Sequence, residues 1–166
     1  MTNRVVYSAY CWVLSALCVL LIGGYGGMCF YNDNPEKGWV MIGMLVCLII
    51  PTLIYAPLAI SVDEEYIAVR RPLATKRIPL QAIAAMSYAP PTMGEKRIIA
   101  SGGFMGYWGW FKDWEAGKYF GYYGRASETF LIKLRNGKQY MLGCKDCATF
   151  AEEVKRQIEN LNKRNR

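Results

Sequence analysis

The sequence has no histidine among its 166 residues, and charge is absent from two long stretches of it. Without histidine the chain has no imidazole base, no serine–histidine–aspartate or cysteine–histidine arrangement, and no histidine metal ligand. The composition therefore disfavours an enzyme, and we expect no cofactor and no metal site.

The two uncharged stretches run from Val5 to Tyr31 and from Gly38 to Val62, with only six residues between them. Each is longer than the roughly 20 apolar residues that a helix needs to cross a bilayer. We predict a transmembrane hairpin over residues 1–60, with spans at about 5–31 and 38–60. The first apolar run is too long for a signal peptide, and a second run follows almost at once, so we expect it to be retained.

Basic residues beside the spans predict their orientation. Arg4 precedes the first span, whereas the connecting loop holds Lys37 alone, and four basic residues follow the second span closely (Arg70, Arg71, Lys76 and Arg77). Because basic flanks stay on the cytoplasmic side, we predict a multi-pass protein with both termini in the cytoplasm. The spans contain no ionisable acid or base, which disfavours a pore or a transporter.

The remaining part of the chain is basic. Residues 61–166 hold 18 Lys and Arg against 11 Asp and Glu, so the net charge of +7 belongs to this part. A basic domain close to an anionic leaflet is attracted to it, and the lipid bilayer is an expected partner. The charges are dispersed rather than gathered into one run, so we expect no nucleic acid partner.

Short alternating segments predict a domain rich in strands. Strands are expected at 66–70, 78–80 and 83–88, followed by a break at Ala89-Pro90-Pro91. Two further alternating runs, 129–135 and 138–142, flank Asn136-Gly137, a dipeptide that favours a tight hairpin with positive φ at both turn positions. Residues 147–161 then show an apolar stripe at helical spacing behind Asp146, and 161–166 are predicted to be a basic, solvated tail.

This order of elements resembles the bacterial pleckstrin-homology-like (PH-like) domains. Ser61 to Ile67 followed by Arg77 to Ile83 is similar to the opening strand pair of that family, and Gly102 to Gly109 resembles the glycine-aromatic stretch of one branch. The segments 130–132, 140–142 and 146–150 are similar to its closing hairpin and helix. The resemblance implies an α+β membrane protein of bacteria, in which a transmembrane hairpin precedes a PH-like β-barrel or sandwich, residues 61–160, capped by a C-terminal helix. Such domains share an architecture across many roles.

Cys144 and Cys147 form a CxxC pair at the expected helix start. Such a pair can lower a thiol pKa and support disulfide exchange, or supply half of a zinc site. The other four cysteines lie in the predicted spans, so the second half of a zinc site is missing. We therefore expect two small residues at a helix start, and redox or metal chemistry is the less favoured alternative.

The densest feature of the sequence is its aromatic stretch from Phe104 to Tyr123, which has ten aromatic residues among twenty. Tyrosine and tryptophan favour places where the ring is buried and the polar edge is wet, as at a bilayer or protein interface. Three explanations stay open: a long, glycine-jointed strand pair covering the barrel, an interface, and a ligand pocket. The candidate interface or ligand residues are Phe104, Tyr107, Trp108, Trp110, Lys112, Trp114 and Lys118, and we expect the three tryptophans not to be all core.

These observations predict a membrane-anchored interaction module at the inner face of a bacterial cytoplasmic membrane, which binds a protein partner or associates with itself. A lipid or small-ligand receptor is the alternative, and an enzyme or redox protein is less favoured. Eukaryotic pleckstrin-homology domains suggest phosphoinositides, but bacterial membranes generally lack that lipid. The sequence also shows no dense basic pocket.

Overall fold

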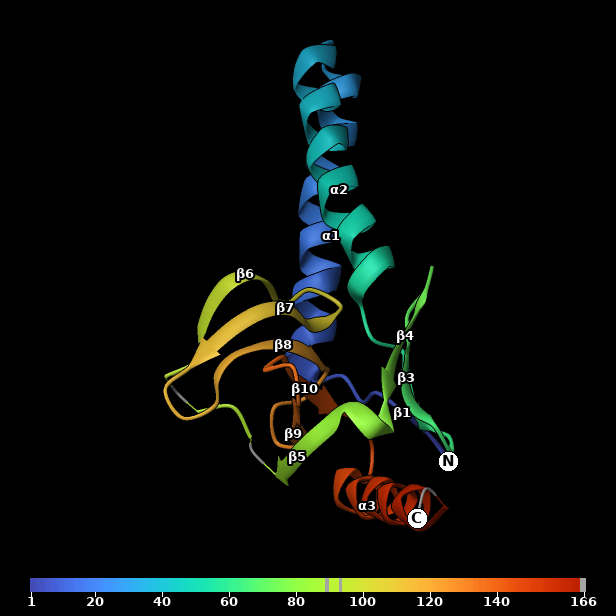
Figure 1. Cartoon of the computed structure of the whole chain (residues 1–166). Helices are drawn as coiled ribbons and strands as arrows, with labels where there is room; N and C mark the ends of the chain where they lie inside the picture. The colour runs from blue at the N-terminus through green and yellow to red at the C-terminus, as the bar shows by residue number, and fades with distance from the viewer. Residues whose placement is uncertain (89, 93, 165–166) are drawn as a thin grey trace.

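The computed structural model describes residues 1–88, 90–92 and 94–164 and places two long helices on one side of a β-rich domain (Figure 1). The helices are α1 (Ala9–Tyr31) and α2 (Pro35–Tyr55), and a C-terminal helix α3 (Cys147–Arg164) lies at the opposite end of the domain. Between them the strands are β2 (Ala59–Val62), β3 (Tyr66–Arg70), β4 (Thr75–Pro79), β5 (Ile83–Tyr88), β6 (Lys96–Gly103), β7 (Gly106–Asp113), β8 (Gly117–Tyr123), β9 (Thr129–Leu134) and β10 (Gln139–Gly143), with β1 (Thr2–Arg4) before α1.

The helix pair agrees with the predicted hairpin, although its bounds differ. Both helices are long and apolar enough to cross a membrane, and most of their large apolar side chains are exposed. α1 begins at Ala9 behind the capping side chain of Ser8, and α2 ends at Tyr55, five residues before the end of the predicted span. The reason is that Pro57 interrupts the helix and that Ala59 and Ile60 pair with β1.

Glycines bring the two helices close together. A Cβ added at Gly26 would lie 3.1 Å from the Cβ of Met41, and one added at Gly38 would lie 2.5 Å from the ring of Phe30. Small residues at these positions let the backbones of α1 and α2 approach, as in other apolar helix pairs.

The first sheet has the order β1-β2-β3-β4. Its edge strand β1 comes from before α1 and pairs with β2 in the register Thr2 to Ser61 and Arg4 to Ala59. The backbone nitrogen of Met1 also donates a hydrogen bond to the carbonyl of Val62 (3.0 Å). The chain therefore enters α1 from the domain and returns to it after α2, so residues 1–4 and α3 lie on the same side of the helix pair.

The second sheet has the order β5-β9-β10-β8-β7-β6, with β10 parallel to β8. β5 and β6 are consecutive in the sequence but lie at opposite edges of this sheet. In Figure 1 β6 is the strand beside the helix pair, and β5 lies toward α3. The described strands thus form a two-sheet sandwich, which matches the predicted fold in its sandwich form rather than as a closed barrel.

The main core lies between the two sheets under α3. Its central side chains are completely or almost completely buried (Ile60, Ile67, Ile78, Phe130, Ile132, Leu142 and Phe150). The predicted stripe on α3 is confirmed, because Cys147, Phe150, Val154 and Leu161 are its buried residues. The predicted hairpin at Asn136-Gly137 also forms, but only Gly137 has a positive φ, 80°. The turn is therefore of the type that ends in a left-handed glycine, and not the two-residue turn expected.

Candidate interaction surface

Strands β6, β7 and β8 form a three-stranded blade, which we define as residues 96–123, extending sideways from the base of the helix pair (Figure 1). All seven candidate residues from the aromatic stretch belong to it. The blade has two faces, because paired residues of neighbouring strands share a face and residues alternate along each strand. The register pairs Trp108 with Tyr122 and Trp110 with Phe120 on one face, and Tyr107 with Tyr123 and Phe111 with Tyr119 on the other.

The first of these faces, called the tryptophan face, contacts the end of α2. The ring of Trp108 stacks on Tyr55 with centroids 5.9 Å apart, and the ring of Phe120 lies 6.0 Å from the same tyrosine. Trp110 meets Phe120 edge to face at 5.2 Å. Trp108 and Trp110 are only half-buried, so this face is neither core nor fully open.

A cation lies where the tryptophan face meets α2. The guanidinium of Arg71, from the connection between β3 and β4, lies 6.0 Å from the ring centroids of both Tyr55 and Tyr122. Burial raises the pKa of Tyr122 to about 12, although the nearby Arg71 acts in the opposite direction. The arginine therefore links the end of α2 to the blade.

Three lysines lie side by side across the blade. Lys112 of β7 is paired with Lys96 of β6 and with Lys118 of β8, and all three are exposed. We call them the lysine row. Within the described residues none of the three has an ion pair with a carboxylate. Lys118 instead lies over the ring of Trp110 at 4.8 Å, and Lys96 over Trp114 at 5.7 Å.

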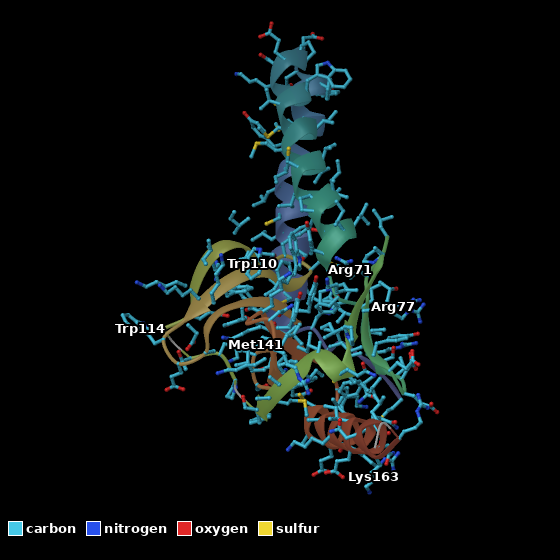
Figure 2. All side chains as sticks on the ribbon, viewed as in Figure 1. Arg71, Arg77, Trp110, Trp114, Met141 and Lys163 are labelled. Carbon is cyan, nitrogen blue, oxygen red and sulfur yellow. The ribbon has the colours of Figure 1, made fainter. Side chains whose placement is uncertain are left out.

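Trp114 lies at the outer turn of the blade, away from Trp110 (Figure 2). Its side chain is 81% exposed, more than any other large apolar side chain among the described residues that follow α2. It borders a shallow cavity of about 240 Å³ whose lining includes Gly94, Lys96 and Lys112. An exposed indole beside lysines is a suitable anchor for a protein or lipid partner.

The opposite face of the blade is a small second core of tyrosines. Phe111, Tyr119 and Tyr123 are completely buried there beside Leu131 and Met141. The carboxylate of Glu95 accepts hydrogen bonds from the hydroxyls of Tyr119 and Tyr123. Burial, with the neighbouring Glu95, raises the pKa of both tyrosines far above the ordinary value, so both hydroxyls stay protonated. Tyr107 stacks on Tyr123 at 5.0 Å and therefore belongs to this face.

Asp113 shapes the outer turn of the blade. Its carboxylate accepts hydrogen bonds from the Thr92 hydroxyl (2.6 Å), from the Thr92 amide (3.1 Å) and from the amide of Glu115 (2.9 Å). Burial acts to raise the pKa of this carboxyl, but the hydrogen bonds outweigh it and the pKa is lowered. The pattern is that of a charged residue that fixes a turn.

The tip of the blade, Phe104 and Met105, packs against the helix pair. The amide of Met105 donates a hydrogen bond to the Ser15 hydroxyl of α1 (2.8 Å), and Met105 has a φ of 48°. Two apolar grooves of about 400 Å³ flank the tip. One groove is lined by α1, as far along the helix as Val19, and by α2. The other groove lies between β6 and the part of α2 from Cys47 to Pro51.

The CxxC pair is buried in the main core, with Cys144 and Cys147 each about 2–3% exposed. A hydrogen bond between the two thiols raises the pKa of Cys144 and lowers that of Cys147. The loop between them is held by β1, because Asn3 donates a side-chain hydrogen bond to the carbonyl of Lys145 (2.7 Å). Their burial fits a packed helix start better than a thiol exchange site.

The PH-like domain matches a known protein family. The family described as Bacterial PH domain matches residues 58–158, which is well over half of the chain. The chain belongs to the bacterial PH domain family. No curated protein and no solved structure matches it. The matched range covers the PH-like domain from β2 to most of α3, and it leaves out β1 and the whole helix pair.

The structure brings Trp108, Trp110, Lys112 and Lys118 together on the tryptophan face of the PH-like domain. It places Tyr107 on the opposite face, Phe104 at the tip, and Trp114 at the outer turn. Tyr55, Arg71 and Glu95 have no local signal in the sequence that marks them as site residues, because each acts through a contact with a distant segment. The one signal in the sequence that could have suggested Glu95 as a buried acceptor is the tyrosine-rich strand that follows it further along the chain, β8.

Proposed function

We propose that this protein is a membrane-anchored interaction module at the inner face of a bacterial cytoplasmic membrane, and that its PH-like domain holds a protein partner there. The helix pair would span the membrane with both termini in the cytoplasm. Membership in the bacterial PH domain family supports an interaction role in general terms. The exposed apolar surface of α1 and α2 supports the anchoring, since a protein in water rarely leaves so much apolar surface open.

One observation carries the choice of binding surface. Trp114 is 81% exposed at the outer turn of the blade, whereas the tip of the blade is held by Ser15 on α1 and Trp108 stacks on Tyr55 of α2. Protein interfaces concentrate their binding energy in a few aromatic and basic residues surrounded by less important contacts. Trp114, with Lys96 over its ring and Lys112 beside it, has this composition.

Binding is favoured over catalysis because the polar groups named here are already engaged in hydrogen bonds or buried. The carboxylates of Glu95 and Asp113 are engaged by tyrosine hydroxyls and by turn donors, and the thiols of Cys144 and Cys147 are buried. A lipid or small-ligand receptor is the second candidate, and the lysine row favours it.

The test is site-specific cross-linking in native membranes. A photoreactive residue at the exposed Glu115 should trap one partner, to be identified by mass spectrometry, and Trp114→Ala should abolish that product. An adduct of twice the chain mass would identify the partner as a second copy. The matched control is Leu73→Ala, which removes another exposed apolar side chain, 69% exposed, from the β3–β4 connection. The proposal fails if the same product forms with Trp114→Ala, or if no product depends on Trp114.

A further inference from the structure

The helix lengths determine how deep the blade must sit. α1 has 23 residues and α2 has 21, so they are about 34 and 31 Å long, close to the ~30 Å of the hydrocarbon layer. The blade occupies part of that length, because its tip contacts α1 at Ser15 and lines a groove with Val19. The rest of α1, residues 20–31, is only about 18 Å long, which is too short to cross the hydrocarbon layer.

The contacts of α2 also indicate that the blade lies alongside part of the membrane-spanning length. The groove between α2 and β6 reaches Cys47, eight residues before the end of the helix at Tyr55. Figure 1 shows β6 beside the lower part of both helices. If the helices span the bilayer, as proposed above, the tip of the blade lies within the leaflet and β6 lies in its headgroup layer.

The side chains of β6 suit that position. Ile98 is 48% exposed and Ile99 is 77% exposed, with Lys96 and Arg97 immediately before them. β6 is also an edge strand, so one side of its backbone has no partner strand. Unpaired backbone groups are excluded from hydrocarbon but are satisfied by water and phosphate oxygens. These features place β6 among the headgroups and only the tip deeper.

The lysine row indicates that the lipid headgroup is anionic. Like charges that face each other across strands destabilise a sheet, and here the unfavourable pairing occurs twice in succession. Because the described residues supply no carboxylate to these lysines, anionic phosphate from outside the chain is the group that would relieve their repulsion. Next to the lysine row on the same face, Ile99 of β6 is paired with Trp110 of β7. These two side chains form an apolar surface that leads toward the groove beside α2.

We propose that the blade of the PH-like domain enters the cytoplasmic leaflet beside the helix pair and binds anionic phospholipid, with the phosphates on Lys96, Lys112 and Lys118 and an acyl chain in the groove between β6 and α2. This inference rests on the proposed membrane anchoring. It does not require the protein partner at Trp114, although the two sites share Lys96 and Lys112.

The experiment uses the full chain in lipid nanodiscs and measures amide hydrogen exchange of β6 by mass spectrometry. Compared with phosphatidylcholine alone, nanodiscs that also contain phosphatidylglycerol should slow the exchange of β6 by about fivefold, the size expected from one basic residue near an anionic surface. Changing all three lysines to glutamine should abolish the difference. The same variant should be about as stable as the parent in phosphatidylcholine, because the repulsion that it loses offsets the loss of two cation–π contacts, Lys118 over Trp110 and Lys96 over Trp114.

A matched control removes the same charge elsewhere. Lys145, Lys155 and Lys163 are exposed and lie just before or within α3, at the end of the domain away from the helix pair. Their replacement by glutamine should leave the effect of phosphatidylglycerol on β6 intact.

Three results would overturn the proposal. They are equal exchange in the two lipids, loss of the effect in the control variant, and the same slowing when inorganic phosphate is added to phosphatidylcholine nanodiscs. The last result would mean a site for free phosphate rather than lipid. Alkaline extraction of native membranes tests the anchoring separately, because a chain released by it is not spanning.

Discussion

The amide of Met105, in a turn with φ of 48°, donates a hydrogen bond to the hydroxyl of Ser15, 90 residues away on α1. A non-glycine residue in this backbone region is strained, and such strain persists only where the surroundings hold it. The contact therefore fixes the tip of the blade to the helix pair. It is also the direct polar link from β6–β7 to α1 on which the depth of the blade depends.

Replacement of Ser15 by alanine should loosen this tip. The amide of Met105 loses its acceptor in a half-buried place, at a cost of about 1 kcal/mol, so its hydrogen exchange should become severalfold faster. Thr52→Ala is the control, since Thr52 is also buried but donates only within α2, to the carbonyl of Leu48. Equal exchange at Met105 in both variants and the parent would contradict this account.

Replacement of Phe150 by alanine should strongly destabilise the PH-like domain. The ring is completely buried and lies 5.9 Å from Phe130, so its removal leaves a cavity under α3 at a cost of about 3–5 kcal/mol. Denaturant unfolding of the full chain in detergent measures the loss. Thr149→Ala, at the exposed neighbouring position, should change stability little, and a similar loss in both variants would show that α3 does not pack as described.

The buried turn carboxylate of Asp113 should make stability depend on acid. Its pKa is lowered in the folded protein, so it stabilises the fold above the unfolded-state pKa and loses this effect as the pH falls through the folded value. Asp113→Asn should therefore lower the melting temperature most at neutral pH, with the difference from the parent narrowing toward pH 3. Asp63→Asn, at an exposed position, is the matched control. A difference for Asp113→Asn that is independent of pH would mean that charge is irrelevant at this turn.

The proposed topology is tested by cysteine labelling. Asn34→Cys lies in the short connection between α1 and α2 and should react with an impermeant thiol reagent added outside the cell. Lys138→Cys, in the β9–β10 turn, should react only after the cytoplasmic side is opened. The parent chain with its six native cysteines gives the background. Labelling of Asn34→Cys from the cytoplasmic side alone would show that the orientation is the reverse of the one proposed.

Local signals in the sequence predicted the parts of the fold that depend on near neighbours. The uncharged runs gave the helix pair, Asn136-Gly137 gave the closing hairpin, and the apolar stripe behind Asp146 gave α3. The missed parts depend on distant contacts. β1 has the sequence Thr-Asn-Arg, which has no apolar pattern, and it becomes a strand only because β2 lies beside it.

The candidate surface could be predicted in its residues but not in its arrangement. Trp108 and Trp110 share one face because alternate residues of a strand point to the same side of a sheet, which their spacing in the sequence already indicates. The stacking of Trp108 on Tyr55, however, depends on where α2 ends, and that point was placed five residues too late. The lysine row was also invisible, because its members are neighbours only through the registers of β6 with β7 and of β7 with β8.

The pairing of β1 with β2 would link assembly of the domain to membrane insertion of the helix pair, if that pair spans the bilayer as proposed. β1 is synthesised before α1, and its partner strand follows α2, so the first sheet is completed only after both helices have been made. A chain whose first helix inserted in the wrong direction would carry β1 to the other side of the bilayer and leave the edge of β2 unpaired. Exposed strand edges promote aggregation. If the helix pair spans a membrane as proposed, the first sheet can therefore be completed only when both ends of the hairpin lie on the same side of the bilayer.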